Sequence, residues 1–340
     1  MTNPFRYGSV VPGTDFCGRQ DLIKQLSSCI KAGQNVVLHG ERRIGKTSLF
    51  VETVRKIKKH RLLRINFMEV KNVDTLCKRI LHAILAMERS GSRFDRLMKN
   101  LAYLRPAIGI NPITGEPSVS FDAMVQLPAE AIPGVLTLMK NLHHEKPLVV
   151  FLDEFQDIQR IEEDPKAVLA LLRGTIQSGL TITVGPLSHQ DFKHYLAKKF
   201  QTGSLRVDPI ALDKVFKITD GVTGDIQQLC EALWSVSGVI GEERIAQALQ
   251  LIFSREQTFY EVILARLTAN YVRILKALAH VGGTQPTSSV FVRQAAAFNV
   301  SAIPQALKRM ENQRIVFHDG RQWRFSNPFF GAWLLAQQEI

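Results

Sequence analysis

A glycine-rich loop at residues 40–47 places the strongest limit on how this chain of 340 residues can fold. Gly40, Gly45, Lys46 and Thr47 match the pattern G-x-x-x-x-G-K-[ST]. The segment before it, NVVLH (35–39), predicts a buried parallel strand, and the segment after it has apolar residues at helical spacing. Strand, glycine loop and helix in this order place backbone N–H groups and a helix N-terminus around phosphate groups. The sequence therefore predicts a phosphate-binding loop.

The side chains of this loop have separate expected roles. Lys46 is expected to reach the β- and γ-phosphates of a nucleotide, and Thr47 to offer its hydroxyl to Mg²⁺. Ser48 is the second hydroxyl at this helix start and the less favoured metal ligand of the two.

The centre of the loop is charged, with Glu41, Arg42 and Arg43 preceding Ile44. In this motif such positions contribute mainly backbone to the phosphates, so Arg43 and Ile44 are counted with the nucleotide-binding residues. Their side chains are free to point away from the phosphates. We expect the arginines to pair with acids on a lid domain or on a neighbouring subunit.

A second candidate site, which is acidic, lies about a hundred residues downstream of the phosphate loop. The segment PLVVFLDEFQDI (147–158) is a continuous apolar run that ends in Asp153 and Glu154. Such a run predicts a central parallel strand whose C-terminal edge carries the carboxylates. Asp153 is expected to bind Mg²⁺, directly or through water, and Glu154 to polarise the attacking water. Together with the loop, this pair predicts a Mg²⁺-dependent ATPase; slow turnover is expected if the protein acts as a molecular switch.

A third segment, DFCGRQDLIKQLSSCI (15–30), places Phe16, Gly18 and Arg19 before an amphipathic helix. With these three segments the sequence resembles the AAA+-related ATPases of the archaeal and STAND type. The resemblance implies an α/β P-loop NTPase core of the ASCE/AAA+ kind, with a parallel sheet, a helical lid and a winged helix. It also implies that Phe16, Gly18 and Arg19 lie beside the adenine; the alternative is a helix start with a packed phenylalanine. The segment NPITGEPSVSF (111–121) is similar to a turn and strand that this group inserts between the two motifs.

The region after Asp153 departs from that resemblance. Such ATPases have another core strand that ends in a polar sensor residue, whereas here LTITV (180–184) is the only strand candidate before the lid. Either one strand and its sensor are missing, or LTITV is the sensor strand with Thr181 or Thr183 in that role. We nominate no sensor residue.

The expected domains are an ATPase core at residues 1–203, a helical lid at 204–262 and a winged-helix domain at 263–340. Asp208-Pro209 is a helix start signal in the lid, and DGVTGDIQQLC (220–230) resembles the family's glycine-rich turn near the nucleotide. In the last domain, three helical segments precede VFHDGRQWRFS (316–326), which alternates around a hairpin turn.

The third of these helices, SAIPQALKRMENQRI (301–315), would be the recognition helix of the winged-helix domain. The candidate DNA contacts on it and on the neighbouring hairpin are Gln305, Lys308, Arg309 and Arg321. Winged helices in such ATPases also act as protein-contact modules, and the apolar segment NPFFGAWLL (327–335) could dock on another domain or subunit.

The net charge of +12 and the isoelectric point near 9.7 are compatible with a phosphate-rich partner and with an ordinary basic surface. The sequence contains no long apolar run and no signal-peptide pattern near its start, so we expect a cytoplasmic protein without a membrane partner. The leading hypothesis is an ATP-driven molecular switch that uses ATP and Mg²⁺ and acts on a protein partner or on itself. The alternative is an ATP-regulated DNA-binding or DNA-remodelling protein. A small-molecule kinase is disfavoured because neither the lid nor the winged helix offers an acceptor pocket.

Overall fold

The computed structural model describes residues 3–11, 13–88, 99, 107–110, 117–120, 122, 126–145, 147–173, 179–185, 187–235, 239–296 and 300–337. The chain forms two compact units, and each is described by itself. Unit 1 contains Met1–Gly18, Gly40–Gly45 and Val184–Ile340, and unit 2 contains Arg19–His39 and Lys46–Thr183. Six residues of the phosphate loop are therefore grouped with the C-terminal part of the chain, while the helix that follows them belongs to unit 2.

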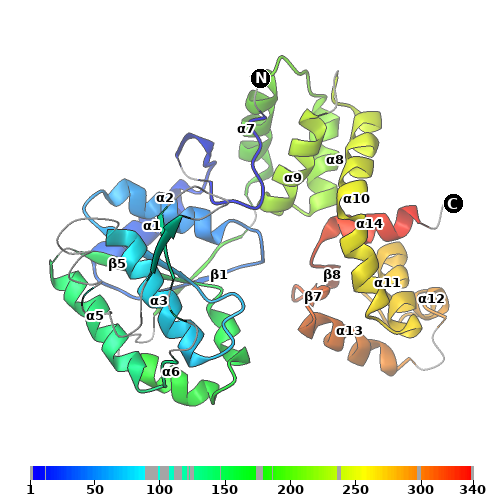
Figure 1. Cartoon of the computed structure of the whole chain (residues 1–340). Helices are drawn as coiled ribbons and strands as arrows, with labels where there is room; N and C mark the ends of the chain where they lie inside the picture. The colour runs from blue at the N-terminus through cyan, green and yellow to red at the C-terminus, as the bar shows by residue number, and fades with distance from the viewer. Residues whose placement is uncertain are drawn as a thin grey trace. The chain divides into compact units, whose positions relative to one another are not determined.

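Unit 2 is built from parallel strand pairs and covering helices (Figure 1). β1 (Val36–His39) pairs in parallel with β6 (Leu180–Thr183), and β2 (Arg61–Asn66) pairs in parallel with β5 (Leu148–Asp153). β3 (Ala107–Ile110) and β4 (Pro117–Ser120) form an antiparallel hairpin. The segment expected as an inserted turn and strand thus contains β4, while its turn, residues 111–116, lies outside the described residues.

In the described part of unit 2, these strands are accompanied by α1 (Gln20–Lys31), α2 (Lys46–Ile57), α3 (Val73–Glu88), α5 (Ala131–Glu145) and α6 (Pro165–Arg173). α3 packs on β2 and on α5, and its buried face includes Leu76, Ile80 and Ile84. α2 is fixed to β5 by the stacked rings of Phe50 and Phe151, whose centroids lie 4.3 Å apart. These contacts hold the N-terminus of α2 and the C-terminal end of β5 in one body.

The sequence correctly predicted parallel strands, but these strands are less buried than expected. NVVLH was expected to be buried, but the side chain of Val37 is 54% exposed. The strand before Asp153 was expected to be central, yet β5 pairs only with β2 among the described residues. No described strand joins β1 to β5, and β6 bonds β1 alone. The apolar runs were read correctly as parallel strands, and among the described residues each of these strands has a single strand partner.

Unit 1, as far as its residues are described, is mainly helical and contains one hairpin. After the short 3₁₀ helix η1 (Gly13–Asp15), it contains α7 (His189–Gln201), α8 (Pro209–Thr219), α9 (Thr223–Trp234) and α10 (Glu242–Ala265). Asp208 caps α8 by accepting a hydrogen bond from the Ile210 N–H, which confirms the predicted start signal. Chain segment Met1–Gly18 is attached to α7, because the Lys199 ammonium contacts the Asp15 carboxylate at 2.9 Å.

The rest of unit 1 is a winged helix of three helices and a hairpin, followed by one more helix. The helices are α11 (Ala269–Val281), α12 (Ser289–Gln294) and α13 (Ala302–Asn312), and the hairpin pairs β7 (Val316–His318) with β8 (Trp323–Phe325). The Ser288 hydroxyl accepts a hydrogen bond from the Phe291 N–H and caps α12. The predicted arrangement of this region is confirmed.

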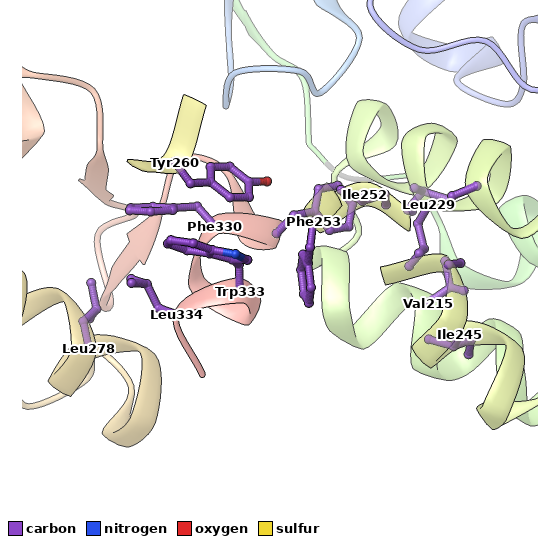
Figure 2. Close-up of a cluster of buried hydrophobic side chains, with 14 of the residues drawn as sticks. Val215, Leu229, Ile245, Ile252, Phe253, Tyr260, Leu278, Phe330, Trp333 and Leu334 are labelled. Atoms are coloured by element: carbon purple, nitrogen blue, oxygen red, sulfur yellow. The ribbon is translucent and has the colours of Figure 1, made fainter. Parts of the chain in front are cut away.

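One continuous core joins the helices 205–265 to the winged helix (Figure 2). α10 is 24 residues long, and it buries Ile245 and Ile252 against α8 and α9 and Tyr260 against α14 (Pro328–Ala336). The apolar segment 327–335 docks here within the chain: Phe330 and Trp333 lie on the Tyr260 ring with centroid distances of 5.2 and 5.3 Å. The expected boundary between residues 262 and 263 falls inside α10, and the division 1–203, 204–262 and 263–340 remains a prediction.

No helix in the described ranges is long and apolar enough to cross a lipid bilayer.

Candidate functional site: the phosphate loop and its partners

The glycines of the loop occupy positions where a side chain could not fit or would be strained. Gly40 has a φ of 157°, and a Cβ there would lie 2.4 Å from the Val184 carbonyl oxygen. Gly45 has a φ of 94°. Arg43 also has a positive φ, 60°, which is uncommon for a residue other than glycine and marks a turn held by its surroundings.

Arg43 is held by the turn that opens α9. The Gly224 N–H donates to the Arg43 carbonyl oxygen at 2.9 Å, and the Arg43 guanidinium donates to the Gln228 Oε1 at 2.8 Å. The guanidinium also forms an ion pair with Asp225. Burial raises the pKa of the Asp225 carboxyl to about 6, because desolvation outweighs the opposing effect of Arg43. The expected pairing of a loop arginine with a lid acid is therefore found for Arg43, within unit 1.

The next loop residue is anchored to the same turn. Ile44 is buried, and its carbonyl oxygen accepts a hydrogen bond from the Thr223 hydroxyl at 3.2 Å. Three consecutive residues at the start of α9 therefore contact two consecutive residues of the phosphate loop.

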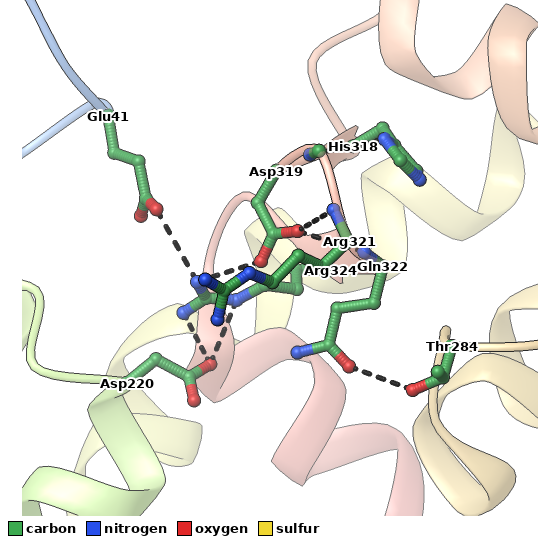
Figure 3. A network of polar contacts seen from close by, with 9 residues as sticks. Glu41, Asp220, Thr284, His318, Asp319, Arg321, Gln322 and Arg324 are labelled. Atoms are coloured by element: carbon green, nitrogen blue, oxygen red, sulfur yellow. Dashed lines mark hydrogen bonds and ion pairs between the residues drawn. The ribbon is translucent and has the colours of Figure 1, made fainter.

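A second network joins the loop to the hairpin of the winged helix (Figure 3). Arg324 on β8 contacts three carboxylates: Asp220 at 2.6 Å, and Glu41 and Asp319 at 3.5 Å each. Asp319 accepts hydrogen bonds from the backbone N–H groups of Arg321 and Gln322, which forms the hairpin turn. Glu41 of the loop, Asp220 of the lid and Arg324 of the wing are thereby one electrostatic cluster.

In unit 2, the start of α2 meets the end of β5. Lys46, Thr47 and Ser48 form the first turn of α2. The Thr47 hydroxyl lies 3.2 Å from Oδ1 and 3.0 Å from Oδ2 of Asp153. The two residues predicted to hold Mg²⁺ are therefore adjacent. A hydroxyl beside a carboxylate is a set of hard oxygen donors, which fits Mg²⁺.

Asp153 has another neighbour that the sequence did not indicate. The Arg64 guanidinium on β2 donates to the Asp153 Oδ2 at 2.7 Å. β2 and β5 pair so that Arg64 lies opposite Phe151, two positions before Asp153. The side chain therefore reaches along the sheet edge to the carboxylate.

Glu154 follows the strand in the left-handed conformation, with a φ of 53°, and precedes the 3₁₀ helix η3 (Phe155–Arg160). This turn separates the direction of its side chain from that of Asp153. The Gln156 amide donates to the Glu154 Oε2 at 2.6 Å.

The adenine candidates lie at the start of α1. Phe16 is partly buried and its N–H donates to the Gly13 carbonyl oxygen. Gly18 has a φ of 66°, and a Cβ there would lie 2.9 Å from a methyl group of Leu187. Arg19 precedes α1 with a φ of 59°, and its carbonyl oxygen accepts from the Ile23 N–H. Gly18 is therefore required by the backbone conformation and by the close approach of Leu187. Contact of these three residues with adenine remains a prediction.

The recognition-helix candidates share the exposed face of α13. Gln305, Lys308 and Arg309 are exposed, while Ile303, Ala306, Leu307 and Met310 are buried. Lys308 forms an ion pair with Glu311, and Arg309 donates to the Tyr271 hydroxyl at 3.2 Å. Arg321 is exposed at the tip of the hairpin.

Comparison with known protein families assigns two parts of the chain. The family described as AAA ATPase domain matches residues 15–184, half of the 340 residues. This chain belongs to the AAA ATPase domain family. A second family, described as a probable winged helix domain, matches residues 258–336 of this AAA ATPase. The predicted recognition and fold class, an AAA+ P-loop ATPase with a C-terminal winged helix, are confirmed.

Solved structures similar to this AAA ATPase span nearly its whole length. A Walker-type ATPase of Pyrococcus abyssi covers 98% of this chain and 99% of its own, with a TM-score of 0.64 and 16% identity. The ADP form of the ORC2 protein of Aeropyrum pernix covers 99% and 98%, with a TM-score of 0.44 and 13% identity. At 16% identity, the likeness to the Pyrococcus abyssi ATPase supports the fold alone. No curated protein matches the chain.

Sequence reasoning found the loop and the acidic strand end, and it missed three partners of those residues. Arg64 was an unremarkable basic residue in a strand, and Arg324 was one of several basic residues in or near the predicted wing. Acids of the lid were expected to pair with the loop arginines, but Asp225 itself was not named, because its turn looked at least as suited to helix packing as to nucleotide contact. Gly224, the residue before Asp225, was a clue to this contact, because a glycine is required where another chain segment approaches closely. A Cβ at Gly224 would lie 2.9 Å from the Arg43 Cβ and 3.1 Å from the Arg43 carbonyl oxygen.

Proposed function

We propose that this AAA ATPase is a molecular switch that binds and slowly hydrolyses ATP, and whose nucleotide state controls the winged helix. The observation that carries the proposal is the pair of contacts made by the phosphate loop. Arg43 binds Asp225 and Gln228 of α9, and Glu41 binds Arg324 of β8. A loop that touched only the nucleotide would not need either contact.

In this proposal the nucleotide is held by residues of the loop and the helix after it. The backbone of Gly40, Arg43, Ile44 and Gly45 and the N-terminus of α2 surround the phosphates, and Lys46 neutralises part of their charge. Ser48, in the first turn of α2, is also assigned to nucleotide binding. Phe16, Gly18 and Arg19 are assigned to the adenine side by resemblance.

Thr47 and Asp153 would hold Mg²⁺, whose charge offsets that of the phosphates. Their 3.0 Å contact supports this assignment. Glu154 would accept a proton from the attacking water, and the hydrogen bond from Gln156 orients its carboxylate before the water arrives.

The switch follows from charge balance around the loop. A triphosphate adds negative charge beside Arg43 and Glu41, and this weakens the pull of Asp225 on the arginine and strengthens the repulsion of Glu41. The ligand then binds the loop conformation with altered lid and wing contacts more tightly, and it shifts the population toward that conformation.

The first experiment separates binding from hydrolysis. Lys46→Ala is expected to abolish binding of a fluorescent ATP analogue, and Glu154→Gln to keep the affinity while turnover falls at least about a hundredfold. Lys46→Ala protein that binds and hydrolyses ATP like wild type would overturn the nucleotide assignment.

The second experiment tests the coupling itself. Arg324→Gln removes the cation between Glu41 and Asp220 at a residue outside the phosphate loop, and we expect a change of about three- to tenfold in ATP affinity. Arg321→Gln, which removes the same charge from the exposed tip of the same hairpin, is the matched control. Equal affinities in the two variants would refute the coupling.

A second candidate function, ATP-regulated binding of duplex DNA, is favoured by the exposed face of α13. Gln305, Lys308 and Arg309 lie together on that face, with Arg321 on the hairpin, as a recognition helix and wing would need. The double variant Lys308→Glu/Arg309→Glu is expected to weaken duplex binding and to lower its salt dependence. Binding unaffected by this change would remove the candidate, and stimulation of ATP turnover by DNA would support it. The remaining candidates for the molecule that the switch acts on are a protein partner and a second copy of the chain.

A further inference from the structure

The carboxylate assigned to Mg²⁺ already has a cationic partner. The Asp153 Oδ2 accepts from the Arg64 guanidinium at 2.7 Å and from the Thr47 hydroxyl at 3.0 Å, while the Thr47 hydroxyl lies 3.2 Å from Oδ1. One carboxylate oxygen thus has two donors, and one of these donors carries a full positive charge.

A guanidinium at this distance opposes a metal ion in two ways. It neutralises the charge that attracts the ion, and it occupies a lone pair that the ion or its water would use. Arginine cannot give up its proton in a protein, so it can only move aside. Movement is open to it, because the Arg64 side chain is 39% exposed and lies at the sheet edge.

We propose that Arg64 is a positioning residue that competes with Mg²⁺ for Asp153 and so sets the divalent-ion concentration at which the nucleotide site closes. This inference rests on the proposed function, in which Asp153 serves the metal. Without the metal, Arg64 holds the carboxylate beside Thr47 and keeps the pair in place. When the metal arrives, Arg64 turns toward solvent.

The test is a Mg²⁺ titration of fluorescent ATP-analogue binding to the full chain, starting in EDTA. Arg64→Met keeps the aliphatic bulk and removes the charge, and we expect half-saturation at about three- to tenfold less Mg²⁺ than wild type, as suits a partly exposed pair. Arg64→Lys keeps the charge and is expected to stay within about twofold of wild type. Lys59→Gln, an exposed charge removed just before β2, is the matched control and should leave the titration unchanged.

Binding of Mn²⁺ without nucleotide, followed by the loss of the free-ion EPR signal, gives a second readout. It should tighten in Arg64→Met by a similar factor. An unchanged or weaker Mg²⁺ and Mn²⁺ dependence in Arg64→Met would overturn the inference, because an arginine that merely oriented Asp153 would help the metal to bind. Wild-type protein that binds no ATP would instead refute the proposed function, so the two failures are distinguishable.

Discussion

At the scale of single residues, Asp225 shows how burial and an ion pair oppose each other. Its pKa is raised from 3.8 to about 6 even though Arg43 lies beside it, because the carboxyl is almost fully removed from water. The folded chain therefore binds the proton more tightly than the unfolded chain between these pH values. The stability from this group is full below about pH 4 and is lost as the pH rises through about 6.

Asp225→Asn should remove this pH dependence. The amide keeps the shape and still accepts a hydrogen bond from Arg43, but it carries no charge to desolvate. Between pH 4 and pH 7, the free energy of unfolding of the wild type should fall by up to about 3 kcal/mol more than that of the variant. Urea unfolding at a series of pH values measures this difference. Identical slopes for the two proteins would show that folding does not raise the pKa of Asp225.

Gly224→Ala should damage the loop through packing alone. Its Cβ would lie 2.9 Å from the Arg43 Cβ and 3.1 Å from the Arg43 carbonyl oxygen, so the loop backbone or the turn must shift. We expect a loss of about 1–3 kcal/mol in unfolding free energy together with weaker ATP binding. Gly134→Ala is the control: it lies within α5 with no atom within 4 Å of its Cβ, and alanine should stabilise that helix slightly. ATP affinity at the wild-type level in Gly224→Ala would contradict the expected loss of binding.

The residues found from the sequence and those missed differ in what specifies them. Lys46, Thr47 and Asp153 were found because a motif spacing or a strand end fixes their place. The contact of Arg64 with Asp153 depends on strand register, which pairs Arg64 with Phe151 and which no local pattern encodes. Arg324 meets Glu41 across 283 positions of the chain, so only the folded unit reveals that contact.

At the scale of elements, the strands were predicted in type and position but not in burial. A continuous apolar run has the same appearance whether its strand has neighbours on both sides or on one. β1 and β5 carry such runs, and among the described residues each has one strand partner. The sequence after Asp153 offered LTITV as its one strand candidate, and this segment forms β6, which pairs with β1.

Two alanine substitutions compare an exposed with a buried strand position in unit 2. Leu63 on β2 is 1% exposed and Val37 on β1 is 54% exposed. Leu63→Ala should cost about 2–5 kcal/mol of unfolding free energy, whereas Val37→Ala should cost less than about 1 kcal/mol. Urea unfolding of both variants provides the comparison. A cost at Val37 that equals the cost at Leu63 would mean that another strand or chain covers β1 in solution.

At the scale of the whole molecule, the lid and the winged helix need not be separate folding units. The sequence placed a boundary between residues 262 and 263, since the pattern of short helices changes there. α10 runs from Glu242 to Ala265 without a break, and its two ends contribute to one core. In the proposed switch, this helix would carry changes at the lid to the winged helix.

Tryptophan fluorescence can decide whether residues 204–340 unfold as one body. The sequence has three tryptophans, and all of them lie in unit 1: Trp234 on α9, Trp323 on β8 and Trp333 on α14. The variant W323F/W333F leaves a probe in the lid, and W234F/W333F leaves one in the hairpin. α9 packs on α10 directly, and the hairpin packs on α14, which itself packs on α10. We therefore expect the two urea unfolding midpoints to coincide once corrected for the stability of each variant measured by circular dichroism. Two separate midpoints would show that the lid and the winged helix are independent domains joined by a helix, and the signal from the phosphate loop would then have to pass through Arg324.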